Sequence, residues 1–387
     1  MIKFLHIITD DKFSEPTIKR FDEIHQIESR YLLFKKRAAL TYLKDNDRVI
    51  VLSDKNNFIK ELLVSDYDVL FLHSLSPISY WIFKYIPSDK VVIWWAWGYD
   101  IYGGLFGKRL FIPIDILKEK TKIILIDKPI KKKVRDYLGR LWISFLFYKY
   151  HNRIIRRIDY FEPVREMDYR LMCKYTSGFR AKEFYHYFNA DTNRPFLNHS
   201  LLKHKSILIG NSAAPSENHV DVWDEIKGKL PKGVKVIIPL SYGDKDYAQK
   251  VTSRLPFSDV QIEILNRYLP REEYFGIVNS CAYAFFGSIR QHAMGNIYHA
   301  LSNDIKVFLY KESVMYGYLK KVGFVIYAIE DLDDNSFSPI TESEHNQNMT
   351  AFEIENKYMK EKYDEAMEEI EQIVKSKRFA EKILGPL

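Results

Sequence analysis

Cysteine is scarce in this sequence, whose 387 residues include only Cys173 and Cys281. Two cysteines cannot build the disulfide framework that stabilises small secreted domains. Both lie in apolar surroundings typical of a protein core, and this pattern fits a reducing compartment. We therefore expect a cytoplasmic protein whose stability comes from a packed interior.

Long hydrophobic runs are also missing. The longest, Val91 to Trp97 and Leu141 to Tyr148, fall far short of the roughly 20 residues that span a bilayer. The first residues, Met1–Asp10, lack the apolar region and the small-residue cleavage site of a signal peptide, and their pattern predicts a buried strand. We expect that the chain does not cross a membrane.

The sequence lacks the usual signatures of metal and cofactor sites. Its histidines and carboxylates are scattered without the spacing of metal ligands. It contains no Gly-x-Gly-x-x-Gly loop, no P-loop lysine motif and no nucleophile elbow. We therefore expect neither a metal ion nor a bound cofactor, so that polar loops would have to supply any chemistry.

What the sequence does contain is typical of a soluble globular protein with two domains. Hydrophobic residues make up 47% and charged residues 28%, a balance that argues against disorder. A chain of 387 residues exceeds the usual size of a single domain. Aromatic residues are unusually frequent, at 15%, and the net charge is +7.

Positive charge is concentrated in the segment Lys131–Arg157. Its middle, Leu141–Tyr148, is apolar and includes Trp142, and its basic residues are Lys131, Lys132, Lys133, Arg135, Arg140, Lys149, Arg153, Arg156 and Arg157. Three interpretations remain open. The segment is a core helix with solvated ends, an interfacial helix on an anionic membrane surface, or a nucleic-acid surface. The last is disfavoured because no nucleic-acid-binding module accompanies the charge, and we expect no nucleic acid partner.

Short apolar runs alternate with helical patterns along the whole chain, which indicates parallel sheets covered by helices on both faces. In the first half the predicted strands are Ile2–Thr9, Arg48–Ser53, Val69–His73, Val91–Trp97 and Ile123–Ile126. In the second half they are Ile207–Gly210, Val234–Leu240, Val260–Ile264, Tyr283–Phe286, Lys306–Leu309 and Val325–Tyr327.

The series breaks at a polar stretch, residues 189–205, which is the natural linker. We expect one domain over residues 1–188 and another over 206–345, with a charged helix within 346–387 that packs back on the domains. This α/β arrangement of two Rossmann-like sheets facing a cleft suggests the two-lobed GT-B architecture of glycosyltransferases. In that architecture the N-terminal domain would be acceptor-binding and membrane-facing, and the C-terminal domain would bind the nucleotide sugar.

Polar residues follow the predicted strands of the second half, where open α/β sheets bind their ligands. An arginine, amides and hydroxyls in these loops suit a phosphate-bearing donor. The candidate donor-binding residues are Gly210, Asn211, Ser212, Ser241, Tyr242, Arg290, Gln291, Gly295 and Asn296. Tyr242, Leu269 and Tyr274 are candidate walls for a nucleobase. Alternatively, Gly295 and Asn296 only open and cap a helix.

Three residues of the first half are candidate general bases, in the order Asp100, His73 and Glu15. Asp100 follows three tryptophans that could desolvate its carboxylate and raise its basicity. As alternatives, Asp100 caps the following turn and His73 is a structural histidine. A reaction that retains the anomeric configuration would need no such base.

Four blocks occur together in one order: Trp94–Tyr102, Leu208–Ser212 with Asn218 and His219, Val236–Tyr242, and Phe286–Asn296. With these four blocks in this order, the chain resembles the bacterial TDP-N-acetylfucosamine:lipid II N-acetylfucosaminyltransferases, which are also called 4-alpha-L-fucosyltransferases. The resemblance implies a GT-B fold and a dTDP-activated amino-deoxy sugar as donor. It also implies an undecaprenyl-diphosphate-linked saccharide as acceptor, on the way to enterobacterial common antigen or a related surface polysaccharide.

The resemblance extends from Ile2 to about Ile329, whereas Lys131–Arg157 is more basic and aromatic than the family pattern and the tail from Ser336 matches poorly. A lipid-linked acceptor would place the enzyme on the cytoplasmic face of the bacterial inner membrane, as a peripheral protein. Three alternatives stay open: a transferase of the same fold that uses a UDP-sugar for capsule or O-antigen, a sugar-nucleotide epimerase, and a non-catalytic membrane-associated protein that binds nucleotide sugars.

Overall fold

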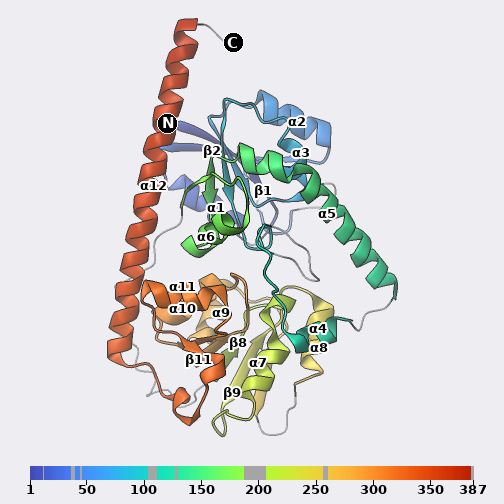
Figure 1. The fold of residues 1–387 in the computed structure, drawn as a ribbon, viewed down its shortest axis with the longest axis vertical. Helices are drawn as coiled ribbons and strands as arrows, with labels where there is room; N and C mark the ends of the chain where they lie inside the picture. The colour runs from blue at the N-terminus through green and yellow to red at the C-terminus, as the bar shows by residue number, and fades with distance from the viewer. Residues whose placement is uncertain are drawn as a thin grey trace.

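The computed structural model describes residues 1–11, 13–35, 40–43, 46–102, 111–126, 130–186, 206–255 and 260–384. Within them the chain forms two parallel β-sheets, one of seven strands and one of six. Each sheet is flanked by helices, and Figure 1 shows the two layered units stacked along the long axis of the molecule. We call the unit built on the seven-stranded sheet the first lobe and the other the second lobe. The predicted two-sheet α/β architecture is confirmed.

The first lobe has the strand order β3-β2-β1-β4-β5-β6-β7. Its strands are β1 (Ile2–Ile8), β2 (Ile27–Phe34), β3 (Val49–Leu52), β4 (Val69–His73), β5 (Val91–Trp95), β6 (Tyr160–Glu162) and β7 (Lys182–Glu183). Its helices are α1 (Ser14–Asp22), α2 (Lys55–Val64), α3 (Pro77–Ile82), α5 (Ile130–Arg157) and α6 (Glu166–Tyr175). The central strand β4 is buried along its whole length, which explains its unbroken apolar sequence.

The second lobe has the strand order β10-β9-β8-β11-β12-β13. Its strands are β8 (Ser206–Ile209), β9 (Lys235–Pro239), β10 (Gln261–Leu265), β11 (Cys281–Phe286), β12 (Lys306–Leu309) and β13 (Tyr327–Ala328). Its helices are α7 (His219–Ile226), α8 (Lys245–Thr252), α9 (Arg271–Val278), α10 (Met294–Ser302) and α11 (Val314–Val322), with a 3₁₀ turn, η2, at Pro215–Glu217. The strand order in both lobes reverses beside the first strand, as in other doubly wound sheets.

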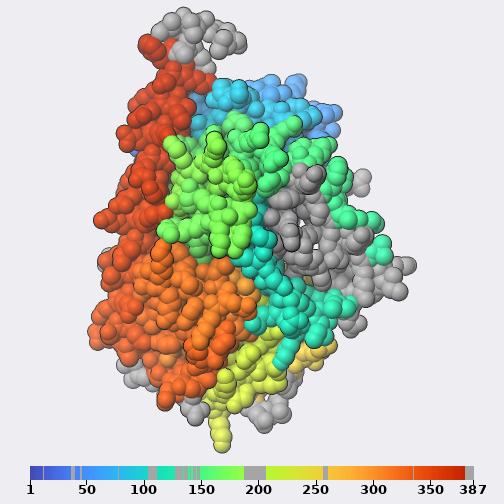
Figure 2. All heavy atoms as spheres, in the orientation of Figure 1, coloured from blue at the N-terminus to red at the C-terminus, as the bar shows by residue number. Residues whose placement is uncertain are grey.

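The segment that carries α4 (Glu119–Ile126) crosses from the first lobe to the second. Ile124 and Leu125 are buried in the same hydrophobic cluster as Trp223 and Ile226 of α7. On the face shown in Figure 2, the segment passes along the surface from one lobe to the other. A domain boundary at residue 188 does not account for this crossing. The predicted linker, residues 189–205, lies outside the described residues.

The prediction of a strand at Ile123–Ile126 is wrong, because these residues form the last turn of α4. Ile124 and Leu125 are buried, whereas Ile123 and Ile126 are exposed. That spacing matches one face of a helix, and a run of four apolar residues cannot distinguish the two states. A strand was also missed at β2, whose apolar residues are interrupted by Glu28, Ser29 and Arg30.

The long helix α12 (Glu342–Leu384) packs along both lobes (Figure 1). Phe352 belongs to the core of the second lobe, and Met367 and Ile370 belong to a cluster on the sheet of the first lobe. Between them, the buried Glu355 accepts hydrogen bonds from Tyr298 and Tyr318, each at 2.5 Å. The helix therefore ties the two lobes together.

Candidate active site

The loop after β8 turns sharply around a buried carboxylate. Gly210 has φ +67°, and a Cβ atom there would overlap Glu217 and His219. Glu217, only 1% exposed, accepts hydrogen bonds from the amide of Asn211 at 2.8 Å and the hydroxyl of Ser212 at 2.9 Å. Only glycine suits this conformation and this close approach, so Glu217 sets the shape of the predicted donor loop.

The same carboxylate connects this loop to the loop after β11. His292 Nε2 lies 3.3 Å from Glu217 Oε1, and its Nδ1 lies 3.2 Å from Ser216 Oγ. Arg290 Nη2 is 3.5 Å from the same Ser216 oxygen, and its Nη1 donates to the carbonyl of Gln291 at 2.7 Å. Asn211, Ser212 and Arg290, predicted from separate strand ends, therefore meet in one polar network.

Arg290 carries its charge in a partly buried place between the lobes. Burial lowers the pKa of its guanidinium, while Tyr102, Glu217 and Asp168 act in the opposite direction. A guanidinium with little water around it interacts more strongly with an incoming anion than an exposed one does. The network can therefore hold a negatively charged group such as a diphosphate.

The start of α10 lies next in the chain. Asn296 accepts a hydrogen bond from the Tyr274 hydroxyl at 2.7 Å, and burial followed by the charge of Glu217 raises the pKa of Tyr274. Gly295 is exposed, with open space at its Cβ position. The amides of Asn296 and Ile297 donate to the carbonyl of Ala293, so only the amides before them, around Gly295, are candidates for binding an anion at this helix N-terminus.

The other donor candidates differ in exposure. Ser241 and Tyr242 are exposed after β9, and the carbonyl of Tyr242 accepts a hydrogen bond from the amide of Ala213. Gln291 is buried. Leu269 is also buried and packs in the core of the second lobe, which does not fit its predicted place as a wall of the nucleobase site.

In the first lobe, Asp100 organises its own loop. Its carboxylate accepts hydrogen bonds from the amides of Leu75 and Trp97 and from the indole nitrogen of Trp94, at 2.8–3.0 Å. Burial raises the pKa of Asp100, and these donors oppose the shift. With both oxygens engaged and only 4% exposed, Asp100 matches the turn-capping alternative better than the role of a base.

His73 ends β4 in a cluster of buried histidines. Its Nε2 lies 3.0 Å from His6 Nδ1, and His6 Nε2 lies 3.1 Å from Ser29 Oγ. Burial, followed by the nearby His186, lowers the pKa of His73 well below its usual value. His73 is therefore a neutral imidazole at the end of the sheet.

Glu15, the third candidate base, lies in the first turn of α1 and is partly exposed. It is separate from the histidine cluster and from the Asp100 loop in the contacts that the described residues make. The structure thus does not gather Asp100, His73 and Glu15 into one set, unlike the donor candidates.

Two residues of this region were not predicted as site residues: Glu217 and Asp168. Glu217 lies close to Gly210 in the sequence, and a carboxylate at that place was the available signal. Asp168 lies 66 residues from Tyr102, with which it pairs, and no local pattern indicates that contact. Among the described residues, no group of three or more His, Cys, Asp or Glu side chains is arranged to hold a metal ion.

Solved structures share this fold at very low sequence identity. An α,α-trehalose-phosphate synthase (UDP-forming) from Burkholderia vietnamiensis matches with a TM-score of 0.60 and 8% identity, over 96% of this chain and 100% of that one. A structure described as trehalose-6-phosphate from E. coli bound with UDP-2-fluoro glucose matches with a TM-score of 0.57 and 10% identity, over 96% and 99%. A glycosyltransferase from Rickettsia africae ESF-5 gives 0.56 and 12%, over 97% and 99%.

These likenesses establish the GT-B fold. The family described as 4-alpha-L-fucosyltransferase glycosyl transferase group 56 matches residues 146–367, more than half of the chain. The match includes the whole second lobe and the network around Glu217. The chain belongs to this family and is a glycosyltransferase.

Proposed function

We propose that this glycosyltransferase moves a deoxy-amino sugar of the 4-acetamido-4,6-dideoxygalactose type from a dTDP-sugar to a saccharide linked to undecaprenyl diphosphate. The main support is the network around Glu217, which joins the Gly210–Ser212 loop to His292 and Arg290. The family supports a fucose-like sugar. The nucleotide and the lipid-linked acceptor rest on the resemblance of the sequence blocks.

Sugar transfer requires stabilisation of the negative charge that develops on the leaving diphosphate. In this proposal Arg290 supplies a positive charge held by Ser216 and by the Gln291 carbonyl. The amides of the first turn of α10, around Gly295, would bind the same anion. Tyr242 and Tyr274 would border the nucleobase. We expect these groups to replace a metal ion, so that transfer continues in the presence of a chelator.

The acceptor hydroxyl would be oriented by the first lobe. Asp100 would contribute by holding the Trp97–Tyr102 loop, because its carboxylate already accepts three hydrogen bonds. His73 and the partly exposed Glu15 remain the candidate bases. Glu15 ranks first, because burial lowers the pKa of His73 and so disfavours its protonated form.

Helix α5 supports an anionic membrane surface as the place of action. One face of its first half exposes apolar side chains at helical spacing: Val134 (52% exposed), Leu138 (58%), Leu141 (49%), Trp142 (54%) and Phe145 (53%). Arg153 and Arg156 are exposed further along. An exposed apolar stripe beside basic residues is typical of interfacial helices. In the described part of the chain, no helix combines the length and apolarity needed to span a bilayer.

Not all of the predicted membrane residues serve this proposal. Arg157 donates hydrogen bonds to the carbonyls of Pro87 and Lys90 and pairs with Asp159. It therefore fastens α5 to the first lobe, and we leave it out of the lipid-binding surface. Lys131, Lys132 and Lys133 belong to α5, but their side chains lie outside the described residues.

Nucleotide binding tests the proposal most directly. Calorimetric titration with dTDP, UDP, GDP and CMP should show the tightest binding for dTDP, and Arg290→Ala should weaken it at least tenfold. Preference for UDP would keep the transferase and change the donor. Binding of dTDP that is equal in the wild type and in Arg290→Ala would remove the network from the donor site. Conversion of donor without acceptor would favour an epimerase, and absence of nucleotide binding would favour a non-catalytic protein.

A further inference from the structure

The two lobes touch at the loop that carries Arg290. Gly98, in the loop after β5 of the first lobe, has φ +78°. A Cβ atom there would stand 2.7 Å from Gln291 Oε1 and 2.9 Å from Arg290 Nη1. These distances are too short for any side chain, so the backbone of the first lobe is in close contact with the donor loop of the second.

Tyr102 extends this contact into a chain of hydrogen bonds. It follows Gly98 in the same loop and is only 1% exposed. Its backbone amide donates to the carbonyl of Gly98 at 3.0 Å, and its hydroxyl donates to Asp168 Oδ1 at 2.5 Å. The hydrogen bonds therefore run from Gly98, which packs against Gln291 and Arg290, through Tyr102 to the carboxyl of Asp168.

Asp168 anchors this series of hydrogen bonds. It is fully buried in the first turn of α6, and its second oxygen accepts a hydrogen bond from the amide of Arg165 at 3.4 Å. Arg165 itself reaches the second lobe, with its Nε 2.8 Å from the Tyr298 hydroxyl and 3.4 Å from Glu355. The anchor of Tyr102 is thus part of the structure that holds the lobes together.

We propose that Tyr102 and Asp168 are positioning residues for sugar-nucleotide binding: they fix the Gly98 loop of the first lobe against Gln291 and Arg290, and so hold Arg290 in the conformation that binds the donor diphosphate. This inference rests on the proposed function, because it takes Arg290 to be a donor-binding residue. It makes the donor site a joint product of both lobes, although its direct ligands come from the second.

A merely structural pair would affect stability alone. Tyr185 is a matched control, because it is also 1% exposed and its hydroxyl donates to a carboxylate, Glu183 Oε1, at 2.8 Å. This second pair lies at β7, the edge strand of the same lobe. Tyr102→Phe and Tyr185→Phe each remove one buried hydroxyl, so their stability losses should be similar.

The experiment compares dTDP binding by calorimetry, the KM for donor and the KM for acceptor in these two variants. We expect Tyr102→Phe to raise the dTDP Kd and the donor KM about tenfold, the effect of losing roughly one positioned hydrogen bond, with the acceptor KM unchanged. Tyr185→Phe should leave all three constants at wild-type values. Equal Kd values in the two variants would overturn the inference.

Two further variants separate the possible failures. Asp168→Asn keeps the shape of the anchor but weakens its hold on the Tyr102 hydroxyl, so it should raise the dTDP Kd in the same direction as Tyr102→Phe. If Arg290→Ala binds dTDP normally, the proposed donor site itself is wrong. If Arg290→Ala loses binding while Tyr102→Phe and Asp168→Asn keep it, only the positioning role is wrong.

Discussion

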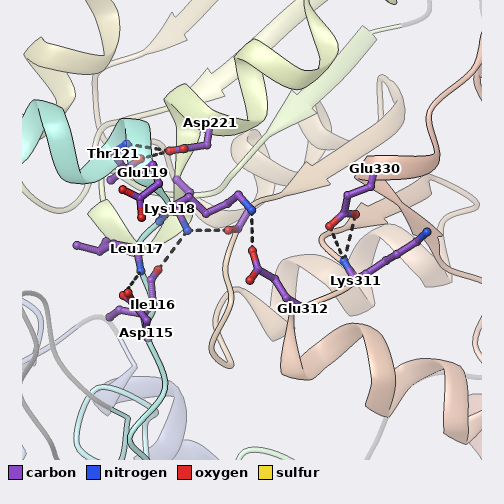
Figure 3. A network of polar contacts seen from close by, with 12 residues as sticks. Asp115, Ile116, Leu117, Lys118, Glu119, Thr121, Asp221, Lys311, Glu312 and Glu330 are labelled. Atoms are coloured by element: carbon purple, nitrogen blue, oxygen red, sulfur yellow. Dashed lines mark hydrogen bonds and ion pairs between the residues drawn. The ribbon is translucent and has the colours of Figure 1, made fainter.

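Thr121 of α4 is hydrogen-bonded to Asp221 of α7, although the two residues are 100 positions apart in the sequence. The carboxylate of Asp221 accepts hydrogen bonds from the amide of Thr121 at 2.9 Å and from its hydroxyl at 2.6 Å. Figure 3 shows this pair, with Lys118 reaching Glu312 nearby at 2.6 Å. Asp221 thus caps α4 from another helix, and this contact places a segment of the first half on the second lobe.

Removing this cap should destabilise the protein. Asp221→Ala leaves two amides, of Lys120 and Thr121, without their acceptor, so we expect a loss of about 2 kcal/mol in the free energy of unfolding. Urea unfolding measures it. Asp224→Ala, on the same helix but in surface ion pairs with Lys120 and Lys227, should cost under about 1 kcal/mol. Equal losses would show that α4 does not depend on Asp221.

Gly210 should be indispensable to the donor loop. Gly210→Ala introduces a Cβ at φ +67° that overlaps Glu217 and His219, so we expect a stability loss of about 1–3 kcal/mol and at least tenfold weaker dTDP binding. Gly228→Ala is the control, because it has open space at its Cβ position, and it should change stability by under about 1 kcal/mol. A Gly210→Ala variant with wild-type affinity would contradict the proposed place of the diphosphate.

The buried histidines should make the protein sensitive to mild acid. Burial and neighbouring imidazoles lower the pKa of both His6 and His73, so both are neutral in the folded state. The unfolded chain takes up these protons below about pH 6.5, and the stability that both groups contribute is present above that pH and lost as the pH falls below it. Each group adds up to about 1.4 kcal/mol per pH unit to this loss.

His6→Gln should therefore flatten the pH dependence. Between pH 6 and pH 5, we expect the variant to lose about 1 kcal/mol less than the wild type in urea unfolding. His25→Gln is the control, since His25 is exposed to water in the folded protein. The same slope in the wild type and in His6→Gln would show that His6 does not take up a proton on unfolding.

Helix α5 should mediate binding to anionic vesicles. We expect Arg153→Glu with Arg156→Glu to weaken co-sedimentation with phosphatidylglycerol vesicles at least tenfold, since each basic residue contributes about 1 kcal/mol. Trp142→Ser should weaken it further by removing exposed apolar surface. Lys357→Glu with Lys360→Glu, an equal charge reversal on the exposed face of α12, should bind normally. If the α5 and α12 variants bind equally, α5 is an ordinary surface helix.

Local sequence patterns predicted the structure correctly where a single strand or a single loop determines it. The strand at Val69–His73 has the predicted bounds, because a strand buried on both faces has to be continuously apolar. The donor loop was predictable for a similar reason: Gly210, Asn211 and Ser212 follow directly on a buried strand. The sequence pattern gave a wrong prediction at α4, because four consecutive apolar residues fit a strand as well as a helix. The cap that Asp221 provides for this helix is a tertiary contact that the local sequence does not show.

The amino-acid sequence by itself determined the two parallel sheets, the family and the loops that follow the strands of the second lobe, since these depend on residues close together in the chain. Only the tertiary structure decided how the loops combine. It engaged the carboxylate of Asp100 in three hydrogen bonds, paired His73 with His6, joined Tyr102 to Asp168, and packed the Gly98 loop against Arg290. These contacts depend on the strand order and on how the lobes dock, which burial of the whole core sets and no short segment encodes.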